Sequence, residues 1–166
     1  MTVIKGIISR DRVAEIQLDG ERIARVLTQQ SELSDQRGPH EGMRIAPGFI
    51  DIQVNGFAGV DFNQPDFQGD ELVDACRNLI ETGVTAFCPT LITADYERLA
   101  RNITTVREAC KKHPLVRSMV LGIHLEGPYI NAEDGPRGAI PKPTFPIPTG
   151  VNSSAFLDWG RDWCEW

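Results

Sequence analysis

Along the first 45 residues, apolar side chains alternate with polar ones in short runs, the spacing of half-buried β-strands. The apolar residues gather in three such runs, at residues 3–8, 13–18 and 23–27. Asp19-Gly20, between the second and third runs, is a two-residue hairpin signal. Residues 29–42 are polar and contain Gly and Pro, so we expect a loop there. The pattern predicts an N-terminal β segment over residues 1–46.

From residue 45 onward, short apolar runs alternate with segments of helical period. The runs at residues 45–54, 84–88 and 119–125 read as buried strands. Asp70 is expected to cap a first helix, which Gly83 ends. Asp95 is expected to cap a second helix, which closes with Lys112 before Pro114 forbids continuation.

The resulting order, three strands followed by βαβαβ, predicts an α/β fold with parallel strands and right-handed crossovers. Two parent architectures fit this order, a doubly wound sheet and an eightfold βα barrel. A barrel needs about 250 residues, and the chain from Pro47 onward supplies at most half of that. If the parent is a barrel, we expect it to be cut short.

Composition narrows the class of partner. With 41% hydrophobic and 24% charged residues in 166, the chain has the balance of one ordinary globular domain. A net charge of −6 disfavours nucleic acid and anionic membranes, which need clustered cations. No apolar run approaches the ~20 residues that cross a bilayer, and the N-terminus shows no secretory pattern, so we expect a cytoplasmic protein. Four cysteines without CxxC spacing are expected to be reduced thiols: Cys76, Cys88, Cys110 and Cys164.

Polar residues follow each predicted inner strand, where the mouth of a barrel would lie. The first strand ends in Gln53, Asn55 and Gly56, the second in residues 88–91, and the third in His124, Glu126, Gly127 and Pro128. A carboxylate after a buried run needs a partner or a cation, so Glu126 is a candidate metal ligand.

Each of the two candidate side chains on the third strand also has a structural alternative. Glu126 would instead cap the following turn or pair with Arg137. His124, two residues before Glu126, points to the same face and would instead be a hydrogen-bonded core histidine. His40 and His113 lie in predicted loops and carry little information.

Three motifs together resemble the N-acetylglucosamine-6-phosphate deacetylases of the amidohydrolase superfamily. They are APGFIDIQVNG at residues 46–56, GVTAFCPTLIT at 83–93 and LGIHLEGPYIN at 121–131. The resemblance covers roughly residues 1–139. It implies that residues 47–139 are the first three strands and two helices of a truncated (β/α)8 TIM-type barrel. It also implies that residues 1–46 are part of a small β-sandwich beside the barrel.

The resemblance also implies a set of site residues. Gln53-x-Asn55 stands where many amidohydrolases have His-x-His, and neutral amides are poor ligands for a transition metal. A single divalent ion, Zn²⁺, is therefore implied, with Glu126 as one ligand. The other two ligands, both histidines, and the catalytic aspartate are expected beyond the end of the chain. Gln53, Asn55 and His124 would lie on the metal or substrate side, and Gly56, Gly127 and Pro128 would shape the loops.

The implied activity is hydrolysis of the acetamide of N-acetylglucosamine 6-phosphate by metal-activated water. The partner would be a small amino-sugar phosphate, the full-length family is expected to be homodimeric, and this chain is expected to be an incomplete, inactive fragment. Alternatives are another amidohydrolase, such as a cyclic-amide hydrolase, and a non-catalytic truncated product. A doubly wound binding module is a further alternative, although no strand is followed by a GxGxxG or P-loop turn.

Residues 140–166 depart from the resemblance and show neither helical nor strand period. The family has Gly-Ala-His, or a close variant, where this chain has Gly138-Ala139-Ile140, and that histidine helps to bind substrate, which places Ala139 on the substrate side. Moving the reading frame by one base permits GAHSQAHIPDPDWREF from this point. We therefore hypothesise that residues 140–166 are frameshifted.

Overall fold

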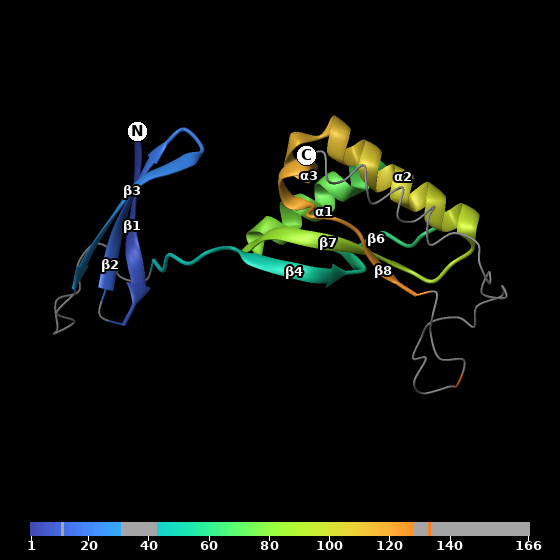
Figure 1. Cartoon of the computed structure of the whole chain (residues 1–166), viewed down its shortest axis with the longest axis horizontal. Coiled ribbons are helices and arrows are strands. Elements are labelled where there is room, and N and C mark those ends of the chain that lie inside the picture. Colours follow the sequence, from blue (N-terminus) through green and yellow to red (C-terminus); the bar gives the residue numbers. More distant parts are fainter. Residues whose placement is uncertain (11, 31–42, 128–132, 134–166) are drawn as a thin grey trace, which may run out of the picture. The chain divides into compact units, whose positions relative to one another are not determined.

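The computed structural model describes residues 1–10, 12–30, 43–127 and 133. The chain divides into two compact units, Met1–Pro47 and Gly48–Trp166 (Figure 1). None of the described helices is both long enough and apolar enough to cross a bilayer.

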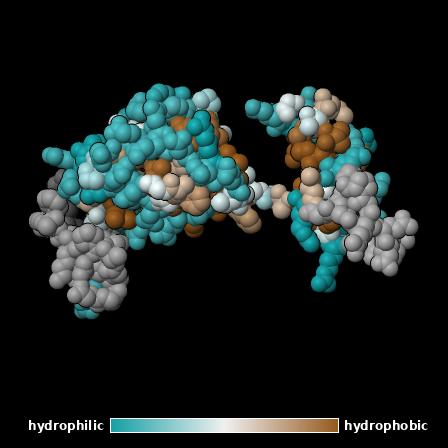
Figure 2. All heavy atoms as spheres, turned by 180° about the vertical axis from the view of Figure 1, so that it is seen from behind, coloured by the Kyte–Doolittle hydropathy of each residue, from teal (hydrophilic) through white to brown (hydrophobic). Residues whose placement is uncertain are grey.

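The N-terminal unit is an antiparallel sheet. It contains β1 (Thr2–Ser9), β2 (Arg12–Asp19) and β3 (Arg22–Gln30) in the order β1-β2-β3. The predicted hairpin is confirmed, since Asp19 pairs with Arg22 and Gly20 has φ +58°. Because side chains alternate between faces, Ile4, Ile16 and Val26 form one apolar row across the three strands. Figure 2 shows apolar side chains gathered on this sheet.

The second unit is built on a parallel sheet of three strands. They are β4 (Phe49–Val54), β7 (Val84–Ile92) and β8 (His124–Glu126), in the order β4-β7-β8. The helices α1 (Gly69–Glu81), α2 (Tyr96–Lys112) and α3 (Pro114–Met119) lie on one face of this sheet (Figure 1). A small hairpin, β5 (Gly56–Phe57) and β6 (Val60–Asp61), follows β4. The predicted α/β class and parallel pairing are confirmed.

Helix α1 begins two residues earlier than its sequence predicts. Gln68 is the N-cap, and its backbone N–H donates to the Glu71 carboxylate at 2.7 Å. The prediction that Asp70 caps the helix is therefore wrong. Asp70 lies inside the first turn and pairs with Lys112 at 3.0 Å, which together with His113 holds the pKa of that carboxyl below its usual range.

The other predicted helix boundaries are confirmed. Gly83 follows α1 with φ +88°, a left-handed conformation that favours glycine. Asp95 caps α2, because its Oδ1 accepts a 2.8 Å hydrogen bond from the Arg98 backbone N–H. Pro114 does not continue α2 and instead occupies the first position of α3, where its missing N–H costs nothing.

Two strand predictions are corrected by the structure. The run that begins at Met119 was expected to be a strand, but Met119 ends α3 and the strand begins only at His124. The second inner strand was expected to stop at Cys88, but β7 continues to Ile92. Pro89 lies within β7 at a register irregularity, where it pairs with Val54, the kind of position at which a strand accommodates proline.

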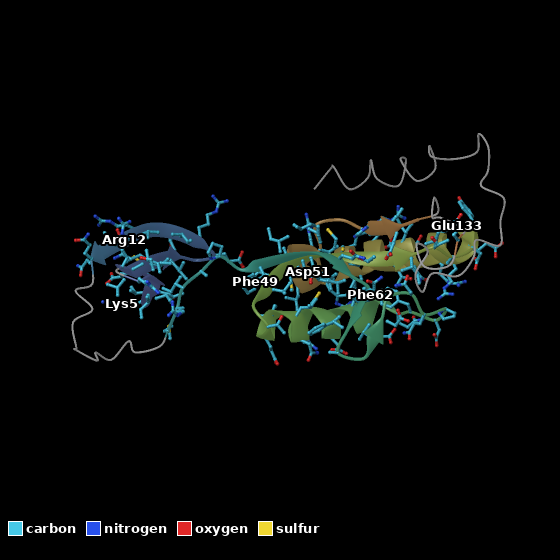
Figure 3. All side chains as sticks on the ribbon, turned by 90° about the horizontal axis from the view of Figure 1, so that it is seen from below. Lys5, Arg12, Phe49, Asp51, Phe62 and Glu133 are labelled. Atoms are coloured by element: carbon cyan, nitrogen blue, oxygen red, sulfur yellow. The ribbon has the colours of Figure 1, made fainter. Side chains whose placement is uncertain are left out.

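The core of the second unit lies between the sheet and its helices. Phe62 and Phe87 are completely buried there, with ring centroids 6.3 Å apart. The edge strand β4 is covered far less, since Phe49, Ile50 and Ile52 are 62–70% exposed. Phe49 at this edge and the buried Phe62 are both labelled in Figure 3.

Phe62→Ala is expected to lower the free energy of unfolding of the 166-residue chain by about 3–5 kcal/mol, because it removes a fully buried ring and leaves a cavity. Phe49→Ala is the matched control: its ring is 68% exposed, so the loss should stay within about 1 kcal/mol. Urea denaturation followed by circular dichroism measures both. Equal losses for the two variants would show that Phe62 does not anchor the core.

Candidate functional site

The carboxyl ends of β4, β7 and β8 meet at one edge of the sheet, because the three strands are parallel. Across this edge the Gln53 amide reaches from the β4 end to β8, and its Nε2 donates to Glu126 Oε2 at 3.4 Å. Strand β7 lies between the two, so the contact passes over the middle strand. Two side chains 73 residues apart in sequence, both predicted at the site, are thus brought together.

His124 makes a second connection from β8 to β4. Its Nδ1 lies 2.9 Å from the Ile52 carbonyl oxygen, which can only accept, so Nδ1 carries the proton in this contact. In the neutral ring Nε2 then keeps its lone pair. The imidazole thus joins the ends of two strands that are not neighbours in the sheet.

The main chain of Glu126 is held at the strand end from two directions. Glu126 pairs with Ile92 in the parallel register, and the Thr93 hydroxyl donates to the Glu126 carbonyl oxygen at 2.9 Å. Gly127 follows with φ +114°, a backbone conformation that L side chains rarely adopt. The chain therefore turns sharply straight after the carboxylate.

The Glu126 carboxylate is half-buried, and within the described residues it accepts a hydrogen bond from the Gln53 amide and pairs with no cation. Its alternative partner Arg137 lies outside the described residues. A half-buried carboxylate with one long contact to a neutral amide retains oxygen lone pairs for a cation. Glu126 thus fits the role of a metal ligand.

A complete metal site is not present in the described residues. No group of three or more His, Cys, Asp or Glu side chains lies close enough there to hold an ion. His113, which sequence left unassigned, lies on the helical side and contacts Asp70 at 2.9 Å. Because Zn²⁺ is normally held by three or four protein ligands, Glu126 fits as one ligand of a larger set.

The other residues predicted at the site are Asn55, Gly56, Pro128 and Ala139, and the structure describes the first two. The Asn55 side chain is exposed, while its carbonyl oxygen accepts from the Phe62 backbone N–H at 3.1 Å. Gly56 has no room for a side chain, because an added Cβ would lie 2.2 Å from the Val60 carbonyl oxygen. Pro128 and Ala139 lie outside the described residues.

Sequence reasoning missed Asn63, a buried residue in the loop after β6. Its Nδ2 donates to the Thr90 carbonyl oxygen at 2.9 Å, and its Oδ1 accepts from the Ile92 backbone N–H at 2.8 Å. The sequence offers only an Asn in a short polar loop, a placement too common to single it out. Its importance is visible only in contacts to residues 27 and 29 positions away.

The described cysteines are free thiols of low reactivity. Burial raises the pKa of Cys76 to about 12, the nearby Cys110 adding to the effect, and raises the pKa of Cys110 to about 11. On β7, burial also raises the pKa of the Cys88 thiol, and the negative charge of Asp51 raises it further. Each of these shifts favours the protonated thiol over the thiolate.

Asp51→Asn is expected to speed alkylation of Cys88 by iodoacetamide at pH 8. Removing the negative charge lowers the pKa of the thiol, so a larger fraction is thiolate. Peptide mass spectrometry follows Cys88 separately from the other cysteines. Asp74→Asn, at an exposed site on α1, is the control and should leave the rate unchanged. An unchanged or slower rate in Asp51→Asn would show that this carboxylate does not act on the thiol.

Several known proteins that match this chain in sequence or in structure carry one enzyme name. No protein-family model matches the chain. The chain is 38% identical over 115 residues to the N-acetylglucosamine-6-phosphate deacetylase of Homo sapiens, a match that covers 69% of this chain and 27% of that protein. It is 43% identical over 110 residues to the Danio rerio protein of the same name, with 65% and 26% covered. For the Haemophilus influenzae protein the identity is 35% over 118 residues, with 70% and 30% covered.

Solved structures agree with the sequence comparison. The N-acetylglucosamine-6-phosphate deacetylase of Pasteurella multocida superposes with a TM-score of 0.66 at 26% identity, covering 89% of this chain and 38% of that one. The Thermotoga maritima deacetylase, at 23% identity, shares the fold with a TM-score of 0.65, covering 89% and 35%. The chain thus spans between a quarter and a third of the curated relatives that it matches. By sequence and by fold it is similar to the N-acetylglucosamine-6-phosphate deacetylases over this part of their length.

Proposed function

We propose that the chain carries part of the active site of a metal-dependent amide hydrolase that removes the acetyl group of N-acetylglucosamine 6-phosphate. The observation that carries this proposal is the contact of Gln53 with Glu126 across β7, at the carboxyl ends of three parallel strands. Reactive groups of parallel α/β sheets gather at this edge. The names of the relatives supply the reaction and the substrate.

Within the site each residue has a distinct part. Glu126 would hold one divalent ion, Zn²⁺, together with two histidines from outside the described residues, and an aspartate, also from outside them, would act as the base. The bound ion would lower the pKa of a water molecule and polarise the acetamide carbonyl. Gln53 holds one carboxylate oxygen of Glu126 by its amide, and His124 ties β8 to the main chain of β4. The Asn55 side chain is exposed and would be available for hydrogen bonds to the sugar.

The same proposal extends to architecture. A parallel sheet with helices on one face and an apolar, uncovered edge strand is what three consecutive units of a (β/α)8 barrel would contribute. The apolar row Ile4, Ile16 and Val26 on the N-terminal sheet supports a β-sandwich, since a second sheet would bury it. Free thiols at the described cysteines fit a reducing compartment such as the cytoplasm.

The 166-residue chain is expected to bind Zn²⁺ weakly at Glu126 and to release no acetate from N-acetylglucosamine 6-phosphate. One carboxylate in place of a full ligand set leaves most of the binding free energy missing, so binding should be roughly millimolar. NMR shifts of the Gln53 side-chain amide report binding, and acetate is measured by a coupled assay. Glu126→Gln should abolish the Zn²⁺-dependent shifts, whereas Glu108→Gln, at an exposed site on α2, should leave them intact. Turnover by the chain alone would refute its inactivity, and shifts that survive Glu126→Gln would refute the metal role.

Restoring one base before the codon of Ile140 is expected to open a longer reading frame and to yield a protein that releases acetate. In that longer protein Glu126→Gln should lower kcat about 100-fold or more, because a lost metal ligand removes several kcal/mol of transition-state stabilisation. Steady-state kinetics with Zn²⁺ present measures the change. If the gene offers no long frame on either side of codon 140, the frameshift hypothesis is wrong, and the metal role of Glu126 remains to be judged by the Zn²⁺ titration.

A further inference from the structure

We propose that Asn63 is a positioning residue that sets the distance between Gln53 and Glu126, and so the geometry of the metal ligand; this inference rests on the proposed function. Asn63 is only 7% exposed, and both polar atoms of its side chain are used. It therefore does not touch a substrate directly. Its effect is on the strand ends that it joins.

The Asn63 amide fastens the β7 end at two points. Nδ2 donates to the Thr90 carbonyl oxygen at 2.9 Å, and Oδ1 accepts from the Ile92 backbone N–H at 2.8 Å. Nδ2 also lies 3.4 Å from the Asn55 carbonyl oxygen, one residue past the end of β4. A single buried side chain thus joins the carboxyl ends of two neighbouring strands. The loop holds it in place, because the Asn63 backbone N–H donates to Asp61 Oδ1 at 2.8 Å.

From these two strand ends the contacts lead directly to the candidate ligand. The Ile92 backbone N–H donates to Asn63 Oδ1, and Ile92 is the residue of β7 that pairs with Glu126 of β8. Thr93, the next residue, donates its hydroxyl to the Glu126 carbonyl oxygen at 2.9 Å. On the β4 side, the Asn63 amide contacts the Asn55 carbonyl oxygen, and Asn55 lies two residues after Gln53. A change in the position of Asn63 would therefore also shift the end of β4 that carries Gln53.

The contact that Asn63 would control is sensitive to small movements. Gln53 Nε2 and Glu126 Oε2 are 3.4 Å apart, already at the long end of hydrogen-bond distance. A shift of about 0.5 Å between the two strand ends would break the contact or tighten it. Groups that orient a metal ligand in this way typically change metal affinity 10–100-fold when they are removed.

Asn102 on α2 provides a matched comparison within the same unit. It is also buried, at 2% exposure, and its Nδ2 donates to the Phe62 carbonyl oxygen at 2.9 Å. Its contacts reach the loop after β6 and not the strand ends. Because Phe62 and Gln64 flank Asn63, replacing Asn102 removes an anchor of the loop but leaves the hydrogen bonds of the Asn63 amide to the β7 end in place, and so separates loop anchoring from the strand-end contacts.

The test uses the 166-residue chain with Asn63→Ala and Asn102→Ala, and Zn²⁺ as the probe. The Zn²⁺ concentration that half-shifts the Gln53 side-chain amide is expected to rise about tenfold or more in Asn63→Ala and to stay within twofold in Asn102→Ala. Hydrogen exchange should also quicken at the amides of β8 relative to those of α2 in Asn63→Ala alone. Unchanged Zn²⁺ affinity and β8 exchange in Asn63→Ala, or equal losses in both variants, would overturn the proposal.

The exchange measurement separates this inference from the proposed function. If the parent chain shows no Zn²⁺-dependent shift at Gln53, the metal role fails, and exchange at β8 alone decides whether Asn63 positions that strand. If Asn63→Ala does not fold, Thr93 tests the same connection. Thr93→Val removes the hydroxyl that bonds Glu126 and should reproduce the β8 effect, while Thr93→Ser should restore parent behaviour. Parent behaviour in Thr93→Val would overturn the inference.

Discussion

The parallel pairing of β4 and β8 on either side of β7 is the constraint on which the candidate site depends. It places the carboxyl ends of three strands at one edge, so that residues at the ends of β4 and β8 can meet. An antiparallel β8 would put Glu126 at the opposite edge, out of reach of Gln53. The helices that connect the strands are therefore part of the site, although none of their side chains contributes to the Gln53–Glu126 contact.

Much of this framework follows from local sequence signals. Alternating and continuous apolar runs locate all three N-terminal strands and the first two inner strands, because burial of one face or both faces decides those patterns. Asp95 and Gly83 mark helix boundaries since each meets a backbone requirement by itself. Met119 is different. Its apolar run predicts a strand, but Pro114 starts a short helix whose buried side chains, Val116 and Met119, lie on one helical face.

The contacts within the candidate site are harder to predict from the sequence than the fold is. Glu126, Gln53 and His124 can be assigned to one edge because they end parallel strands. The partners they take there, Glu126 for Gln53 and the Ile52 carbonyl for His124, depend on packing across β7. Asn63 is hidden for the same reason, because all its informative contacts are to residues far away in sequence. A short polar loop carries no local pattern that separates a buried amide clamp from an ordinary turn.

The uncovered edge of the sheet and the incomplete ligand set have one common explanation under the proposed function. Three large apolar side chains on β4 stand in solvent, which at about 25 cal/mol per Å² is a substantial loss of hydrophobic stabilisation. Further parallel strands beside β4 and β8 would bury these side chains. The same strands would end at the edge where Glu126 lies and would bring ligating side chains to it. Under the proposed function, the same additional strands would therefore cover the exposed apolar edge and supply the missing ligands of the half-buried carboxylate, which pairs with no cation among the described residues.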